Sequence, residues 1–206
     1  MDVFVGLVKQ RLTESAMKID FFHIGYHKTA STWLQLEGFK TNPDIFMCND
    51  ARTELDLYFV NEFVKADELC FDAGQFLQAF SAIITAVDSD YSSRIMGVCE
   101  ENLSGHYWHG GGERLLLDRI SQTFGDTKII ISIRNQFDML NSLYANYVKA
   151  GAGTKSFRRL LDDESMLGSM VFRKLCYHRL IEYAEKLFGT NNVMVFAYEE
   201  FAADQG

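Results

Sequence analysis

The sequence has few of the residues that mark disulfide-rich or metal-binding proteins. Its 206 residues contain one proline, Pro43, and two tryptophans. The four cysteines are widely spaced and form no C-x-x-C pair, so they show no metal-ligand pattern. We interpret them as free thiols of a reduced compartment, and we expect a cytoplasmic protein that requires no metal.

Long hydrophobic runs are absent as well. The apolar stretch at residues 3–8 is only six residues long, which is too short for a signal-peptide core or a membrane span. Positive charge is scarce, because 20 Lys and Arg stand against 28 Asp and Glu. The resulting net charge of −8 argues against nucleic-acid or membrane-surface binding, since both need a basic face. An anionic ligand must therefore be held by local groups.

Apolar runs alternate with amphipathic stretches along the whole chain, which favours one globular domain over residues 1–206. Strands are expected at residues 20–25, 45–48, 95–99, 128–133 and 193–196. Helices are expected at residues 3–17, 31–39, 52–66, 73–87, 113–124, 136–149 and 169–188. Strands that alternate with helices, and that are apolar on both faces, predict a parallel β-sheet with helices on both of its faces.

The first strand is followed by a loop suited to an anion. Residues 19–36 read I-D-F-F-H-I-G-Y-H-K-T-A-S-T-W-L-Q-L, so the order is strand, loop, helix. Gly25 lets the chain leave the strand, Lys28 supplies a positive charge, and three hydroxyls precede or begin the helix, at Thr29, Ser31 and Thr32. Helix N-termini bind phosphate and sulfate. The pattern is not the G-x-x-x-x-G-K-[ST] loop of ATP and GTP enzymes, because His27 precedes the lysine.

A second motif follows the strand at residues 128–133. It places Arg134 and Asn135 directly after the strand, Asp138 in the first turn of the next helix, and Ser142 one turn further on. A guanidinium and a hydroxyl are groups that a dianionic phosphate needs. By their position, Asn135 and Asp138 are expected to fix the turn and to cap the helix.

The two motifs together resemble those of the sulfotransferases. H-K-T-A-S-T-W-L-Q is similar to the family's 5′-phosphosulfate loop, and R-N-Q-F-D-M-L-N-S is similar to its 3′-phosphate motif R-N-P-x-D-x-x-x-S, with Gln136 in place of proline. The resemblance implies a P-loop-like sulfotransferase fold and transfer of a sulfuryl group from 3′-phosphoadenosine 5′-phosphosulfate (PAPS) to an acceptor hydroxyl or amine, with no metal. The residues it assigns to PAPS are His27, Lys28, Thr29, Ala30, Ser31, Thr32, Trp33, Arg134 and Ser142.

The acceptor must lose a proton as it attacks sulfur, so a general base is expected near the anion loop. Glu101 is the first candidate, because it follows the strand at residues 95–99, where proteins of the family carry their base. Lys28 is expected to stabilise the leaving group, and His27 is a further catalytic candidate. Glu100, His106 and His109 are the remaining alternatives.

The chain ends at Gly206, shortly after Y-E-E-F, whereas cytosolic sulfotransferases continue into a segment rich in Gly, Lys and Arg. We therefore keep open a missing C-terminal segment. A nucleotide kinase, with Glu100 as a magnesium ligand, and a non-catalytic nucleotide-binding domain are the alternative functions. The acceptor is a small molecule or carbohydrate whose pocket we expect in the loops at residues 105–112 and 150–163. No G-x-S-x-G elbow is present, which excludes a lipase-type hydrolase.

Overall fold

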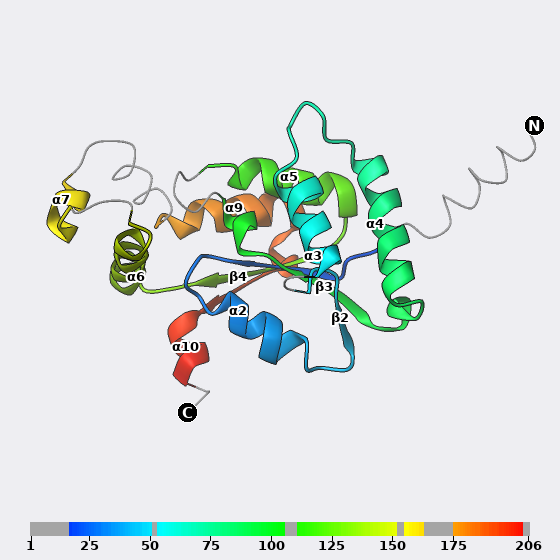
Figure 1. The fold of residues 1–206 in the computed structure, drawn as a ribbon, viewed down its shortest axis with the longest axis horizontal. Helices are drawn as coiled ribbons and strands as arrows, with labels where there is room; N and C mark the ends of the chain where they lie inside the picture. The colour runs from blue at the N-terminus through cyan, green and yellow to red at the C-terminus, as the bar shows by residue number, and fades with distance from the viewer. Residues whose placement is uncertain (1–16, 51–52, 106–110, 152–154, 163–174, 204–206) are drawn as a thin grey trace, which may run out of the picture.

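The computed structural model describes residues 17–50, 53–105, 111–151, 155–162 and 175–203 (Figure 1). The helix expected at residues 3–17 and most of the expected acceptor loop at 105–112 lie outside the described residues. Within the described ranges, no helix is both long enough and apolar enough to cross a bilayer.

Five parallel strands form one sheet in the order β2-β3-β1-β4-β5. They are β1 (Phe21–Gly25), β2 (Ile45–Met47), β3 (Ile95–Cys99), β4 (Lys128–Ile133) and β5 (Val193–Ala197). From β1 the chain passes to the edge strand β2 and returns to β3, which lies between β2 and β1; it then crosses to β4 and β5 on the other side of β1, so the order reverses beside the central strand. A reversal of this kind places the loops that bind ligands at the carboxyl edge of the sheet, beside β1.

The helical segments follow the strands and largely agree with the sequence periodicity. They are α2 (Ser31–Trp33), η1 (Leu34–Phe39), α3 (Glu54–Phe59), η2 (Val60–Val64), α4 (Ala73–Val87), η3 (Tyr91–Ser93), η4 (Glu101–Ser104), α5 (Glu113–Phe124), α6 (Gln136–Lys149), α7 (Phe157–Leu161), α9 (Tyr177–Phe188), η5 (Thr190–Asn192) and α10 (Tyr198–Ala203). Side-chain caps begin several of them; for example, Asp72 accepts from the Gln75 N–H at 2.8 Å, and Thr53 accepts from the Asp56 N–H at 3.2 Å.

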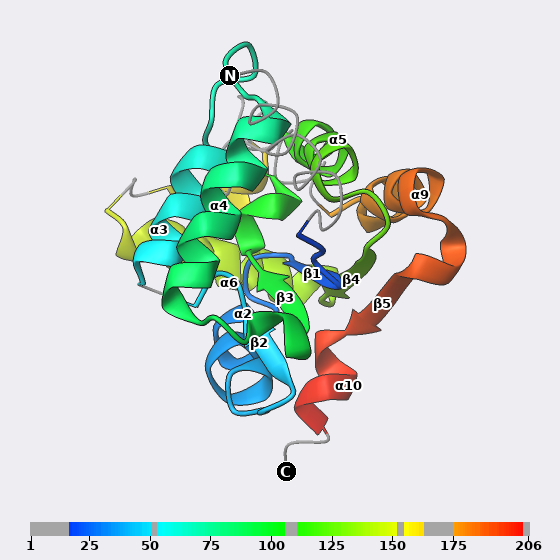
Figure 2. The same cartoon turned by 90° about the vertical axis from the view of Figure 1, so that its right-hand side faces the viewer.

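The molecule has three layers. Helices α3, α4, α5 and α9 cover one face of the sheet, while α2 with η1 and the C-terminal α10 lie on the opposite face (Figures 1 and 2). Helix α6 extends beyond the carboxyl end of β4 (Figure 1). The predicted fold class, a parallel sheet with helices on both faces, is confirmed.

Four local predictions need correction. The helix expected at 169–188 begins at Tyr177, because Leu175 and Cys176 are not helical. The helix expected at 31–39 is divided into the α-helical α2 and the π-helical η1, and that expected at 52–66 into the α-helical α3 and the π-helical η2. Residues Tyr198–Ala203, for which no helix was predicted, form α10. Six residues are too few to show a helical period, so the pattern was not visible.

A cluster of phenylalanines packs α3, η2 and α4 against the sheet. The Phe59 and Phe63 ring centroids are 4.9 Å apart, those of Phe63 and Phe76 are 5.0 Å apart, and those of Phe76 and Phe80 are 5.1 Å apart. Phe63 also lies 5.6 Å from Phe124 of α5. Tilted and offset rings at these separations add about 0.5–1.5 kcal/mol per pair to the free energy of burial.

We expect Phe63→Ala to lower the free energy of unfolding by about 3–5 kcal/mol, because its ring is fully buried and joins three helices. Urea denaturation measures the change. Leu69→Ala is the control, since the Leu69 side chain is 95% exposed and its loss should change stability by less than about 0.5 kcal/mol. Equal effects of the two substitutions would contradict the packing described.

Candidate functional site

A cavity of about 550 Å³ opens at the carboxyl edge of the sheet. This volume lies within the range of small-molecule sites. Segments that follow β1, β3, β4 and β5 all contribute to its walls. The lining residues are His27, Lys28, Ala30, Ser31, Thr32, Glu101, Asn102, Asn146 and Tyr198.

The loop between β1 and α2, which we call the anion loop (residues 26–30), has an unusual backbone. Lys28 and Ala30 adopt positive φ angles of 74° and 62°, although neither is a glycine. Left-handed conformations of non-glycine residues cost about 1–3 kcal/mol and persist only where surrounding contacts hold them. Ser31 then begins a continuous helical segment that runs through η1 to Phe39. The N-terminus of this segment faces the cavity, as the sequence predicted.

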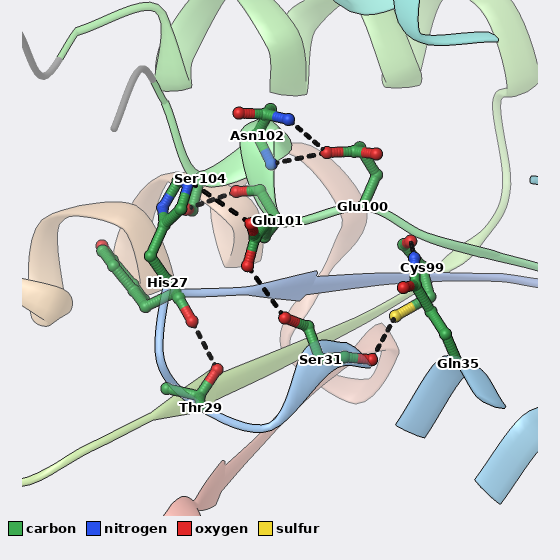
Figure 3. A network of polar contacts seen from close by, with 10 residues as sticks. His27, Thr29, Ser31, Gln35, Cys99, Glu100, Glu101, Asn102 and Ser104 are labelled. Atoms are coloured by element: carbon green, nitrogen blue, oxygen red, sulfur yellow. Dashed lines mark hydrogen bonds and ion pairs between the residues drawn. The ribbon is translucent and has the colours of Figure 1, made fainter. Parts of the chain in front are cut away.

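Glu101, at the start of η4, lies beside the anion loop at the cavity. The Ser31 hydroxyl donates to Glu101 Oε2 at 3.0 Å, and His27 Nε2 lies 3.8 Å from Glu101 Oε1 (Figure 3). The His27 side chain is buried, whereas that of Glu101 remains 40% exposed. Glu101 therefore combines a fixed position with access to a ligand in the cavity.

Arg134 connects the exit of β4 to the anion loop. Its Nη1 donates to the Lys28 carbonyl oxygen at 3.1 Å, and its guanidinium carbon lies 4.7 Å above the centre of the Tyr198 ring. Arg134 Nε is buried and has no hydrogen-bond partner among the described residues. The Arg134 guanidinium thus lies against the backbone of the anion loop, at Lys28.

Asn135 fixes the turn into α6. Its side-chain oxygen accepts from the N–H groups of Phe137 and Asp138, at 2.9 and 3.4 Å, and its own N–H donates to Glu199 Oε1 at 2.8 Å. Asn135 is therefore the N-cap of α6, the role expected from its position in the motif.

The structure brings six of the predicted site residues to the cavity wall: His27, Lys28, Ala30, Ser31, Thr32 and Glu101. Thr29 is fully buried beneath the loop, and the Trp33 ring packs edge-on against Phe201 at 5.1 Å. Ser142, on α6, and Arg134, directly after β4, are not among the lining residues. Contact with a nucleotide stays a prediction for all nine assigned residues. His106 and His109 lie outside the described residues.

Sequence reasoning missed three lining residues, Asn102, Asn146 and Tyr198. Two of them carried a usable signal. Asn146 lies one helical turn after Ser142, so it is on the same side of α6. Tyr198 directly follows β5, at the edge where ligand-binding residues of parallel sheets gather.

The arrangement can now be compared with known structures. A sulfotransferase from Alicyclobacillus acidocaldarius superposes with a TM-score of 0.62, over 92% of this chain and 76% of its own, at 22% sequence identity. The sulfotransferase domain from the curacin biosynthetic pathway superposes with a TM-score of 0.57, over 93% of this chain and 71% of its own, at 12% identity. The chain has the sulfotransferase fold. No protein-family profile matches the sequence, and no curated protein matches it.

In this sulfotransferase fold, the Glu100 carboxylate is turned toward Asn102 rather than toward the anion loop. Its Oε1 accepts from the N–H and the side-chain amide of Asn102, at 2.9 and 2.6 Å. Burial raises the pKa of Glu100, and the nearby Asp56 and Glu101 carboxylates raise it further, whereas the Asn102 hydrogen bonds lower it. Glu100 was an alternative base and the proposed magnesium ligand of a kinase, and it does not line the cavity. Among the described residues, no group of three or more metal-ligating side chains could hold a metal ion.

The raised pKa of Glu100 predicts a pH-dependent stability. The folded protein retains a proton that the unfolded chain releases above the ordinary glutamate pKa, so this residue lowers stability as the pH rises. We expect Glu100→Gln to be more stable than the wild type at pH 7, and we expect this gain to shrink toward pH 4. Urea unfolding at both pH values measures the free energy of unfolding of the variant and of the wild type. If the two proteins differ by the same amount at pH 4 and pH 7, the raised pKa of Glu100 is contradicted.

Proposed function

We propose that this protein transfers the sulfuryl group of PAPS to the hydroxyl or amine of an acceptor. The observation that supports the proposal most directly is the contact between the Arg134 guanidinium and the Lys28 carbonyl. It joins the two motifs that resemble the phosphosulfate loop and the 3′-phosphate motif of sulfotransferases. Both charges then lie at one end of one sheet, where a single bisphosphorylated nucleotide can reach them.

The anion loop supplies the donors for the phosphosulfate end. Lys28 is exposed at the cavity, Thr32 and Ser31 line it, and the loop conformation directs the start of a helix toward it. Arg134 supplies a guanidinium for the other end of the nucleotide, and its unpartnered Nε shows that its hydrogen-bonding capacity is not used up within the described residues. These groups fit an anionic nucleotide in a protein whose net charge is −8.

PAPS supplies the group that is transferred, and the protein supplies position and charge. Lys28 stabilises the negative charge that grows on the leaving oxygen. Glu101, which lines the cavity and is 40% exposed, accepts the proton that the acceptor releases. Ser31 holds Glu101 in place, but its hydroxyl has one hydrogen, which it can donate either to Glu101 or to an anionic ligand. Glu101 therefore opposes nucleotide binding while it serves the reaction.

The nucleotide assignment predicts a selective thermal shift. We expect 3′,5′-ADP to raise the melting temperature more than ADP or ATP does, because only 3′,5′-ADP carries a 3′-phosphate for Arg134. Arg134→Ala should abolish most of this difference. Arg158→Ala is the matched control, since Arg158 is 92% exposed and pairs with Asp162 on α7. Equal shifts with ADP would reject the assignment, and a larger shift with magnesium and ATP would favour a kinase.

The assignment of the base predicts that Glu101→Gln separates turnover from binding. We expect kcat to fall by about 10²–10⁴-fold, because glutamine cannot take up the proton that the substrate hydroxyl or amine releases. Affinity for 3′,5′-ADP should be kept or increased, since the variant removes a negative charge from the cavity. Release of 3′,5′-ADP from PAPS with a panel of phenols and carbohydrates measures turnover. Glu37→Gln, an exposed carboxylate on η1, is the control, and an unchanged kcat in Glu101→Gln would exclude this base.

A further inference from the structure

Four polar side chains lie beneath the anion loop, and none of them is exposed to solvent. His23 belongs to β1, Cys99 to β3, Ser132 to β4, and Thr29 to the loop itself. Each has a relative exposure of 0%. Buried polar groups are costly unless they are paired, so their hydrogen bonds define how this part of the structure is held.

Hydrogen bonds connect the four side chains in one line, which we call the buried chain. His23 Nδ1 lies 2.9 Å from Cys99 Sγ, and His23 Nε2 lies 3.1 Å from Ser132 Oγ. Ser132 Oγ lies 2.7 Å from Thr29 Oγ1, and the Thr29 hydroxyl donates to the Tyr26 carbonyl at 2.5 Å. The line therefore runs from the end of β3, through β1 and β4, to the backbone of the anion loop.

The directions of these bonds follow from counting hydrogens. The Tyr26 carbonyl can only accept, so the Thr29 hydroxyl must donate to it. Ser132 must then donate to Thr29, and His23 must donate to Ser132 from Nε2. His23 Nδ1 is left without a hydrogen, so it accepts from the Cys99 thiol. Four contacts use four hydrogens, and with all four side chains neutral this is the one arrangement that places a hydrogen in each contact.

The surroundings support the neutral forms that this arrangement needs. Burial lowers the pKa of His23 to about 4, and burial together with Glu100 and Glu101 raises the pKa of Cys99. The His23 ring lies between Phe39 and Phe196, with both ring centroids at 6.0 Å. The Ser31 carbonyl, 3.8 Å from Cys99 Sγ, is a longer second acceptor for the thiol.

Gly25 makes room for the buried chain. A Cβ at this position would lie 3.0 Å from Ser132 Oγ, 3.0 Å from His23 Cε1 and 3.2 Å from Thr29 Oγ1. Any side chain at residue 25 would push against three members at once. The glycine at the end of β1 therefore serves the contacts below the loop, in addition to letting the chain turn.

We propose that His23 and Ser132 are positioning residues for the anion loop and that the Thr29 hydroxyl anchors the loop rather than binding the nucleotide. Thr29 lies between Lys28 and Ala30, the two residues with positive φ, so its anchor holds the conformation that directs the loop into the cavity. The sequence assigned all three hydroxyls of the motif to the ligand. In the structure, Ser31 and Thr32 line the cavity, whereas the Thr29 hydroxyl points toward the sheet and contacts Ser132. The inference rests on the proposed function in so far as the loop binds a sulfated nucleotide.

The test compares Thr29→Val, Thr29→Ser, Ser132→Ala and the double variant Thr29→Val/Ser132→Ala. Thr29→Val and Ser132→Ala should each raise the Kd for 3′,5′-ADP about tenfold. Thr29→Ser keeps the hydroxyl, so its Kd should equal that of the wild type. Ser132 is fully buried, so it can affect binding only through its neighbours. The double variant should also be about tenfold weaker, because both substitutions break one connected line; independent effects would give about a hundredfold.

Two further measurements separate positioning from a general loss of stability. Thr127→Val is the matched control, since its buried hydroxyl has no hydrogen-bond partner among the described residues and lies before β4, away from the cavity. It should leave the Kd unchanged. Nitrogen-15 NMR of the His23 ring should show the Nε2–H tautomer in the wild type and a changed ring signal in Ser132→Ala.

Three outcomes would overturn the proposal. These are a multiplicative loss of affinity in the double variant, a Kd unaffected by Ser132→Ala although the melting temperature falls, and an Nδ1–H tautomer in the wild type. Failure of the proposed function looks different: the wild type would not bind 3′,5′-ADP. In that case, the affinity for inorganic sulfate can be compared among the same variants to test whether the loop is still positioned. The His23 tautomer still shows which group donates in each hydrogen bond of the buried chain.

Discussion

The parallel pairing of β1 with β4 determines where the charged groups of the site lie. The register places Gly25 opposite Ser132, so both strands end at the same level. The anion loop after β1 and Arg134 after β4 therefore leave the sheet side by side, and the hydrogen bond from Arg134 to the Lys28 carbonyl follows. A shift of this register would separate the two motifs, although each would keep its local structure.

Charge within the site is local and balanced. In a protein with a net charge of −8, Lys28 and the carboxylate Glu101 line one cavity, and Arg134 contacts the backbone of the anion loop. Ser31 and His27 hold that carboxylate in place. In the proposed reaction, the same contacts would position Glu101 to accept a proton and would place its negative charge where the anionic nucleotide binds, so affinity and reactivity would be opposed at this residue.

The fold was largely predictable because its elements have strong local patterns. β4 is an apolar run bounded by Lys128 and Arg134, and α4 begins at the capping residue Asp72. The start of α9 was predicted too early, since apolar residues with helical spacing continue on the N-terminal side of Tyr177. Of the site, the cavity wall formed by the anion loop and Glu101 was predictable from motif positions, whereas Asn102 was not, because no spacing pattern marks it.

The sequence by itself determined the order of strands and helices, the glycine and hydroxyls of the anion loop, and the residues that follow each strand. These properties depend on neighbours a few positions apart. Only the tertiary structure decided which hydroxyl faces the cavity and which faces the sheet. Thr29 and Ser132 are 103 positions apart, and their contact exists only because β1 and β4 pair in one register. A local pattern contains no information on a partner at that distance.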